Sequence, residues 1–552
     1  MSEHLLSLII FIPLIVAVGV FFIPNDKTLL IKQVTLAATL AQLLLSLILF
    51  MSYDGSFIPS NWNEAFLFVE KVDWIQMRLG QYGVFVIDYF VGVDGISLPL
   101  VVLSSFLLVI GVVSSWNLKE KVKGYFMLYL LLSTSIIGCF VALDLFLFYV
   151  FFEFMLLPMF FLIGIWGGPN RSYASIKFFI YTLLGSLLIL IVMIGLFISV
   201  EDTQKALQLA EQSGRIELVH SFSMVQMMEG TYIYDSLLAP SSDVTILDIP
   251  VRYWAFILLM VGFAIKLPVV PVHTWLPDAH VEAPTAISVI LAGILLKVGG
   301  YGFFRIAYGI FPDGAIEYAF PVACFGVVSI IYGGFAAMAQ SDLKRLIAYS
   351  SVSHMGFVML GLASLTYEGV AGSLFQMISH GLISGALFLI VGVVYDRTHD
   401  RKIENVSGLA SKMPAYTFFT MLFFFASLGL PGFSGFVGEL LSLIGGISAE
   451  NVNGLFPRWL GMIAVFGIVI SGAYYLWTAQ RMFFGKYWTR EESWDVKMKD
   501  LDVREWVMLV PLAVLVLLFG ILPGWILDPV DNSINFFVDQ VLSSGREIIN
   551  NY

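Results

Sequence analysis

The sequence predicts an all-α, polytopic membrane protein with about 14 transmembrane helices, and three observations support this fold class. Apolar runs of about 20 residues, the length of a helix that crosses a bilayer, recur along the whole chain. The 552 residues are 59% hydrophobic and only 12% charged, whereas soluble chains carry about 25% charged residues. Two of the apolar runs are interrupted by proline and glycine, as in transporters that bind ions at mid-membrane.

Fourteen apolar segments are the predicted spans, with ends placed to within a few residues. They are 4–23, 29–52, 94–116, 123–142, 145–166, 173–199, 252–272, 284–305, 316–339, 343–365, 369–395, 413–447, 459–484 and 505–527. The first carries Glu3 and no Lys or Arg ahead of its apolar run, so we interpret it as a helix rather than a signal peptide.

Lys and Arg placement predicts the orientation. Most of the 29 Lys and Arg residues lie in loops after odd-numbered spans, which the positive-inside rule places in the cytoplasm. Both termini and the acidic loops 53–93 and 200–251 are then extracytoplasmic, and the second loop is expected to hold short surface helices. We expect a multi-pass protein of a bacterial inner (cytoplasmic) membrane.

A weak internal symmetry predicts two inverted five-helix repeats with broken helices 7 and 12. Helix 7 carries Lys266 beside Pro268 and Pro271, and five spans later helix 12 is broken at Pro431 and carries Glu439. Five is an odd number, so the second repeat would be inverted. The predicted segments are helices 1–3 with an extracytoplasmic loop (1–122), helices 4–8 with loop 200–251 (123–305), helices 9–13 (306–484), and helix 14 with a tail (485–552).

Three ionisable side chains stand inside apolar spans of the first repeat: Glu153, Lys266 and Lys297. A charge at mid-membrane costs from about 2.5 to more than 10 kcal/mol and is usually functional. We expect Glu153 and Lys266 to form a coupled pair, in which the lysine takes up or releases a proton as the carboxylate moves. The alternatives are a structural role for Glu153 against a backbone group and an extended, interface-seeking Lys297.

The second repeat supplies His354, Glu439 and, as a weaker case, His380. A histidine titrates near physiological pH, so His354 is the natural relay between Lys297 and Glu439. The alternatives are packing roles for both histidines and a half-helix cap for Glu439.

A further cluster lies in the turn between spans 7 and 8: His273, Asp278, His280 and Glu282. Turn capping and proton uptake from the cytoplasm both fit this cluster better than metal binding. Asp144 is expected to begin span 5 rather than to carry protons.

No cofactor site is predicted. Cys139 and Cys324 lie in apolar spans without the spacing of a disulfide, zinc or iron–sulfur site. No glycine-rich phosphate loop follows a strand pattern, so a nucleotide site and redox catalysis within this chain are disfavoured.

Three segments resemble the antiporter-like membrane subunits of respiratory complex I, the proton-pumping NADH-quinone oxidoreductase. They read KLPVVPVHTWLPDAHVEAPTA, LKRLIAYSSVSHMGF and GLPGFSGFVGE. In that family a glutamate of span 5, lysines of spans 7 and 8 and a histidine of span 10 form a charged axis, here matched by Glu153, Lys266, Lys297 and His354. L-type and N-type subunits carry lysine in span 12, so Glu439 makes the chain similar to the M-type, the equivalent of mitochondrial chain 4.

The resemblance implies a division of labour. NADH, FMN, Fe–S clusters and quinone are expected in other subunits, and none in this chain. L-like and N-like subunits, lipid, water and protons are the expected partners, with no nucleic acid. Protons would enter from the cytoplasm, pass Lys297 and His354, and leave at Glu439. The open alternatives are a subunit of a multi-subunit Na+/H+ antiporter, a membrane-bound hydrogenase or plastid-type oxidoreductase, and a structural spacer.

Overall fold

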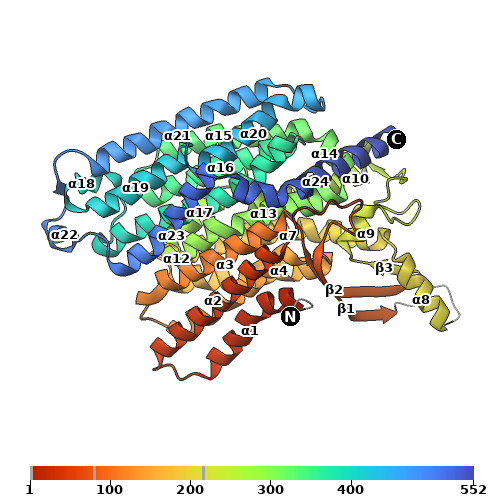
Figure 1. The fold of residues 1–552 in the computed structure, drawn as a ribbon, viewed down its shortest axis with the longest axis horizontal. Coiled ribbons are helices and arrows are strands. Elements are labelled where there is room, and N and C mark those ends of the chain that lie inside the picture. The colour runs from red at the N-terminus through yellow and green to blue at the C-terminus, as the bar shows by residue number, and fades with distance from the viewer. Residues whose placement is uncertain (1–3, 79–82, 214–217, 552) are drawn as a thin grey trace.

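The helices run side by side along one direction in the computed structural model, which describes residues 4–78, 83–213 and 218–551 (Figure 1). The strands β1 (Leu67–Arg78) and β2 (Val84–Val93) and the helix α8 (Thr203–Ser213) lie at one end of this bundle, on the right of Figure 1. We call this the sheet end. The short helices α18 (Leu409–Lys412) and α22 (Glu492–Lys497) lie at the opposite end.

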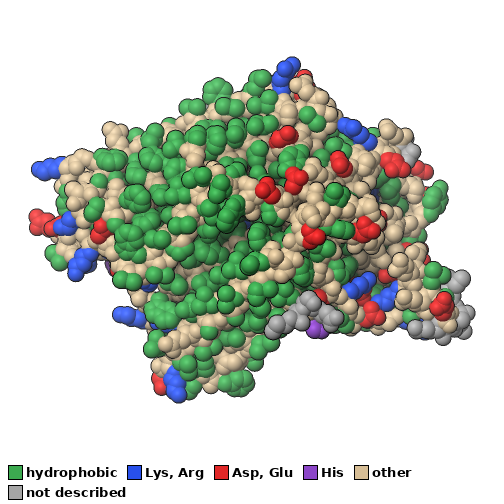
Figure 2. Space-filling view, in the orientation of Figure 1, with side chains coloured by type: hydrophobic (Ala, Val, Ile, Leu, Met, Phe, Trp, Pro, Cys, Tyr) green, Lys and Arg blue, Asp and Glu red, His purple; other side chains and the backbone are tan. Residues whose placement is uncertain are grey.

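Twelve helices among the described residues are long and apolar enough to cross a membrane, which confirms the predicted fold class. They are α1 (Leu5–Phe22), α2 (Thr28–Ser52), α3 (Ser97–Ser114), α4 (Val122–Val141), α5 (Leu145–Phe154) continued by α6 (Leu156–Trp166), α7 (Arg171–Ser199), α12 (Thr285–Ile290) continued through α13 (Leu296–Gly302), α15 (Ala319–Met338), α16 (Leu343–Ala363), α17 (Tyr367–Thr398), α21 (Trp459–Phe483) and α23 (Val503–Ile521). An apolar surface covers the middle of the bundle in Figure 2, with Lys and Arg at the left end and most visible Asp and Glu over the right half.

Two of the predicted spans are split. The predicted span 252–272 is helical only as far as α10 (Val251–Lys266), and the short helix α11 (Trp275–Glu282) forms where a turn was predicted. The predicted span 413–447 consists of α19 (Pro414–Ser427) and α20 (Ser434–Val452). Proline has no N–H to continue a helix, and Gly429 and Gly432 adopt left-handed φ values of +77° and +97°. The breaks therefore fall where the prolines and glycines predict them. The number of about 14 spans stays a prediction, because it depends on counting each split pair as one span.

The loop 53–93 contains a β-hairpin that the sequence analysis did not predict. β1 and β2 pair antiparallel, and β3 (Val219–Ser221) joins β2 in parallel from the second acidic loop. The predicted short helices of that second loop are present as α8 and α9 (Met224–Glu229), of which α9 is largely buried. The small sheet thus ties the two acidic loops together at one end.

The remaining elements close the two ends of the bundle. They are α14 (Pro312–Glu317), the strand pairs β4 (Thr245–Ile246) with β5 (Ile249–Pro250) and β6 (Val406–Ser407) with β7 (Trp488–Thr489), and α24 (Gly524–Asn551). The predicted tail is therefore a 28-residue helix. Arg546 of α24 donates to the carbonyl of Asn453 just after α20, which places the end of α20 at the sheet end with α24.

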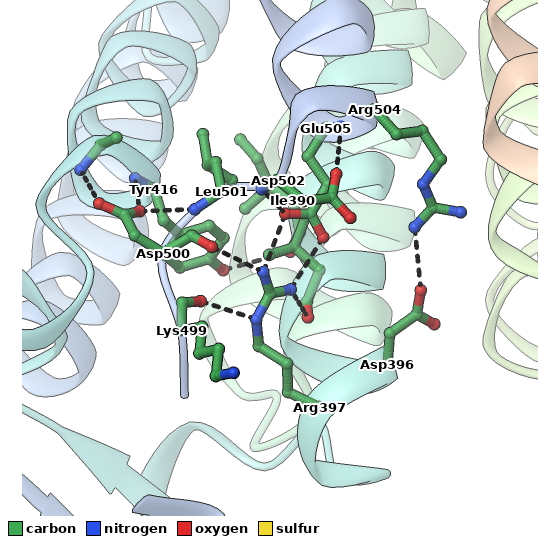
Figure 3. Close-up of polar contacts among 12 residues, drawn as sticks. Ile390, Asp396, Arg397, Tyr416, Lys499, Asp500, Leu501, Asp502, Arg504 and Glu505 are labelled. Atoms are coloured by element: carbon green, nitrogen blue, oxygen red, sulfur yellow. Dashed lines mark hydrogen bonds and ion pairs between the residues drawn. The ribbon is translucent and has the colours of Figure 1, made fainter. Parts of the chain in front are cut away.

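A polar clasp joins α17, α19 and α23 at the opposite end (Figure 3). The Arg397 guanidinium of α17 donates to both carboxylate oxygens of Glu505 on α23, at 2.8 Å each. Asp500 accepts from the backbone N–H groups of Ala415 and Tyr416 at the start of α19. Asp502 and Glu505 also form the capping box of α23. These contacts fix the relative position of three helix ends.

Candidate functional site

Glu153 and Lys266, the predicted pair of the first repeat, come near one another without forming an ion pair. Lys266 ends α10 with 2% of its surface exposed, and its Nζ lies 4.6 Å from the centre of the Phe152 ring. Neither this Nζ nor Glu153 Oε1 has a hydrogen-bond partner in the part of the chain that the structure describes. A lysine over an aromatic face is held by a cation–π interaction. Lys266 therefore lies over the Phe152 ring, within electrostatic range of the Glu153 carboxylate.

Lys297 is fully buried in an irregular part of its span. It follows a π-helical segment, Leu291–Leu295, and a second one, Phe303–Tyr308, begins directly after α13. A π-helical turn leaves a carbonyl without its usual partner, and such turns are frequent at functional sites. Lys297 Nζ donates to the carbonyl of Ala292 at 2.5 Å and lies 2.7 Å from His380 Nδ1. The local helix distortion thus positions the lysine toward α17.

The two lysines are brought close by the packing of their helices. A Cβ on Gly299 would lie 2.7 Å from the backbone N of Leu267 and 3.1 Å from Cβ of Lys266. Only glycine fits here, because real Cβ atoms do not approach backbone atoms this closely. The backbone segments that carry Lys266 and Lys297 are therefore in direct contact.

His380, His354 and Glu439 follow Lys297 as a series of neighbouring side chains. We call these four residues the buried line, and it extends into the predicted second repeat. The imidazole rings of His380 and His354 have centroids 5.5 Å apart, and His354 Nδ1 lies 3.0 Å from Glu439 Oε1. All three side chains are at most 4% exposed. The sequence analysis placed His354 directly between Lys297 and Glu439, whereas the structure inserts the weaker candidate, His380, beside Lys297.

A small cavity borders these side chains. Its lining residues include His354, His380, Glu439, Gln376 and Ser427, and it offers about 10 Å³ to the centre of a water molecule, which is about the space that one water needs. His354 Nε2 lies 3.1 Å from the hydroxyl of Ser427, which itself donates to Tyr475. The Tyr475 hydroxyl continues to Ser350 at 3.1 Å. The second repeat thus holds a connected set of groups that can pass protons.

The two carboxylates of the turn cluster are partly or fully buried, and both have partners. Asp278 pairs with Lys177 of α7 at 2.7 Å and with Arg345 of α16 at 2.6 Å, and Glu282 accepts from the backbone N–H of Asn170. These contacts are structural.

The two histidines of the turn differ from its carboxylates. His273 and His280 are buried, and within the described ranges none of their ring nitrogens has a partner. His280 stacks on Phe388 at 4.5 Å and lies within electrostatic range of Lys297. His280 is therefore the member of the cluster that lies near Lys297.

Lys344, Arg252 and Arg305 are buried basic residues that the sequence analysis missed. They lie near the ends of apolar segments, but Lys344 is 5% exposed, and its Nζ donates to the carbonyl of Ala283 at 2.6 Å. The two arginines are at most 2% exposed and pair with Asp313 and Asp94. The sequence analysis did not single them out, because a charge near the end of an apolar run looks the same in sequence whether it faces water or protein.

Asp144 begins α5, as predicted. Its carboxylate accepts from the backbone N–H of Leu147 at 2.9 Å, the arrangement of an N-cap. Burial raises the pKa of the Asp144 carboxyl to about 7, against hydrogen bonds that lower it.

Comparisons with known proteins show which family the chain is similar to. Residues 142–471 match the family described as NADH:quinone oxidoreductase/Mrp antiporter, TM, and residues 65–143 match NADH-ubiquinone oxidoreductase chain 4, amino terminus. The chain is 40% identical over 554 aligned residues to NADH-quinone oxidoreductase subunit M of Rhodobacter capsulatus, covering 98% of this chain and 97% of the relative.

Solved structures share the fold. A chain of respiratory complex I from Thermus thermophilus with bound NADH is 27% identical, with a TM-score of 0.75 over 98% of this chain and all of that chain. A chain of the Mrp complex from Dietzia sp. DQ12-45-1b has a TM-score of 0.74 at 21% identity over 98% of this chain and 99% of that one, and it shows the fold alone.

Proposed function

We infer the function from the premise that this chain belongs to the family of NADH-quinone oxidoreductase subunit M and NADH-ubiquinone oxidoreductase chain 4. It is a proton-translocating membrane subunit of NADH-quinone oxidoreductase, complex I. Proton translocation through this chain itself is coupled to quinone reduction elsewhere in the complex. NADH, FMN, Fe–S clusters and quinone bind other subunits, and this chain carries no cofactor.

The observation that carries the proposal is the buried line from Lys297 through His380 and His354 to Glu439. Its steps are 2.7 Å from Lys297 to His380 and 3.0 Å from His354 to Glu439, with the two imidazole centroids 5.5 Å apart between them. Each group accepts and releases protons, and each would be costly in a membrane without such a role. The line therefore supports proton movement across the second repeat.

Glu153 and Lys266 act as the trigger of this line. Because Lys266 has no carboxylate in contact, it is free to move between the Phe152 ring and Glu153. Approach of the carboxylate favours a charged lysine, and its withdrawal favours a neutral one. The charge on Lys266 then acts on Lys297 across the close contact at Gly299.

The orientation and partners follow from the family and the charges. The sheet end faces the extracytoplasmic side of a bacterial inner membrane, and both termini lie on that side. L-like and N-like antiporter-like subunits are the neighbours within the membrane arm. Protons enter from the end that carries the clasp and leave beyond Glu439.

The test is proton pumping by the purified complex in proteoliposomes, with this chain carrying Glu153→Gln or Lys266→Ala. We expect loss of NADH-driven acidification while the complex assembles and oxidises NADH with an artificial acceptor. The matched controls are Glu404→Gln and Lys402→Ala, which change exposed residues at the clasp end. Normal pumping by both Glu153→Gln and Lys266→Ala would favour a structural spacer instead.

A sodium-coupled antiporter is the second candidate to distinguish. Co-purification of the chain with NADH-oxidising subunits supports complex I. Its absence, together with sodium transport by the purified complex, would favour the antiporter.

A further inference from the structure

Beyond Glu439, three helices meet through glycines and present hydroxyl groups to one another. The helices are α16, α17 and α20, and the contacts run from Glu439 toward the sheet end. Small residues and hydroxyls are usual where membrane helices pack closely. Packing alone is therefore the ordinary explanation for such contacts.

The first step from Glu439 is Ser442, which lies one turn further along α20. A Cβ on Gly361 of α16 would lie 3.1 Å from Ser442 Oγ and 2.5 Å from Ser373 Oγ of α17. The two hydroxyls therefore face the same narrow space between the three helices. Ser373 donates to the carbonyl of Gly369 at 2.9 Å, as packed membrane serines commonly do.

Ser442 differs from its neighbour Ser373. Its side chain is fully buried, and its Oγ has no hydrogen-bond partner in the described part of the chain. One turn earlier, Glu439 Oε2 is also buried and without a partner. An unpaired buried hydroxyl or carboxylate oxygen costs about 1–3 kcal/mol. Oε2 of Glu439 lies against Gly429 and Oγ of Ser442 against Gly361, so the two groups, at i and i+3 on one face of α20, are joined only when water bridges them.

The hydroxyls continue to the surface. A Cβ on Gly369 would lie 3.1 Å from Thr366 Oγ1, and Thr366 Oγ1 lies 3.1 Å from Ser364 Oγ. The carbonyl of Ser364 accepts from Asn453, a partly exposed residue just after α20. From Glu439 to Asn453 the helix rises about 21 Å at 1.5 Å per residue. We call the hydroxyl groups of Ser442, Ser373, Thr366 and Ser364 the row. The row runs from the buried Glu439 carboxylate to the edge of the sheet end.

The first repeat ends differently on that side. Arg305, on the span of Lys297, pairs with Asp94 just after β2, and Arg252, at the start of α10, pairs with Asp313 at 2.9 Å. A fixed positive charge in a narrow passage opposes the movement of protons. The spans of Lys297 and Lys266 thus end at buried guanidinium groups, whereas beyond Glu439 the Arg546 side chain meets the row at its outer end, where it donates to the carbonyl of Asn453.

We propose that the hydroxyls of Ser442, Ser373, Ser364 and Thr366 form the proton exit of this chain, joining Glu439 to the extracytoplasmic side. The proposal rests on the proposed function and names the residues of its last step. Water enters the row transiently and bridges hydroxyls that do not touch. Each hydroxyl oxygen accepts one proton and gives up its own, and the O–H groups then rotate back before the next proton passes.

The test compares Ser442→Ala with Ser442→Cys in the purified complex in proteoliposomes, reading protons moved per NADH oxidised. Ser105→Ala is the matched control, because Ser105 is a fully buried serine of α3 that bonds only the carbonyl of Val101. Glu439→Gln defines the share of pumping that passes through this exit. We expect Ser442→Ala to lose that share about tenfold, the effect of one lost hydrogen-bond partner, while Ser442→Cys keeps most of it.

A second measurement asks whether water reaches the row. In Ser442→Cys, a small thiol reagent added on the sheet side should label the new cysteine, with the wild-type chain as background for its two native cysteines. Leu443→Cys is the matched control, because Leu443 is buried at the next position of the same helix.

Three outcomes are distinguishable. Normal pumping by Ser442→Ala beside defective Glu439→Gln would overturn the exit and leave the proposed function standing. Equal protection of the cysteines at 442 and 443 would also overturn it, even if Ser442→Ala did not assemble. Normal pumping by Glu439→Gln and Glu153→Gln together would overturn the proposed function itself.

Discussion

The two predicted repeats differ in how their buried charges are paired. In the first repeat, Lys266 and Glu153 are held apart and two arginines are locked to carboxylates at the sheet end. In the second repeat, His354 touches Glu439, and polar groups continue on both sides of that contact. Both helix breaks thus have a buried charge beside them, and the two charges differ in the side chains that contact them.

Burial alone does not separate these two behaviours. Arg305 and Lys297 lie eight residues apart on one span, and both are at most 1% exposed. Arg305 has a carboxylate partner, whereas Lys297 has a histidine and a carbonyl. An arginine keeps its proton at any ordinary pH, and a lysine does not when it is buried. The comparison therefore predicts that Arg305 acts on stability and Lys297 on transport.

The largest stability effect should come from Arg305→Met. Removing one member of a buried ion pair leaves the carboxylate of Asp94 uncompensated and costs about 3–5 kcal/mol. Thermal unfolding or yield of the assembled complex measures the loss. The double variant Arg305→Met with Asp94→Asn should recover most of it, because asparagine removes the charge and keeps the acceptor for the Ser97 N–H. A double variant as unstable as the single one would contradict the pairing.

A smaller effect is expected from Gly299→Ala, at the contact between the two lysine-bearing helices. The added methyl group would press on the backbone of α10, and overpacking costs about 1–3 kcal/mol. Pumping should fall as well, because Lys266 and Lys297 are moved apart. Gly472→Ala is the matched control, since nothing lies within 4 Å of a Cβ there. Equal behaviour of the two variants would remove Gly299 from the coupling.

The smallest effect should come from Lys412→Ala at the clasp end. Lys412 pairs with Asp495 at 2.7 Å, but the two side chains are 37% and 51% exposed. Exposed ion pairs contribute about 0–1 kcal/mol and are screened by salt. Unfolding of the complex should be nearly unchanged, and pumping unchanged. A loss comparable to that of Arg305→Met would show that the buried and exposed pairs do not differ as described.

The sequence was informative where a charge interrupts an apolar run. Glu153, Lys266, Lys297, His354 and Glu439 stand out for this reason, and the prolines and glycines beside two of them predict the helix breaks. The contact between His380 and Lys297 could not be predicted, because it depends on which faces of α13 and α17 meet. The same holds for Arg252 and Arg305, whose partners lie far away in the chain.

Elements outside the membrane were harder to predict. The β1–β2 hairpin lies in a loop whose charges suggested only exposure, and β1 is indeed mostly exposed while β2 is mostly buried. Its pairing with β3 joins segments more than 100 residues apart. The helical tail α24 was missed because its exposed face carries the charges of a solvated segment.

The most direct measurement is the number of protons moved per NADH oxidised by the complex carrying His354→Gln, in proteoliposomes. His399→Gln is the control, because His399 is exposed at the end of α17. Glutamine keeps hydrogen bonds but does not accept a proton at neutral pH, so the buried line should be interrupted. We predict that His354→Gln assembles, oxidises NADH with an artificial acceptor and loses most of its pumping, while His399→Gln pumps normally. Equal pumping by the two variants would contradict a proton path through the buried line.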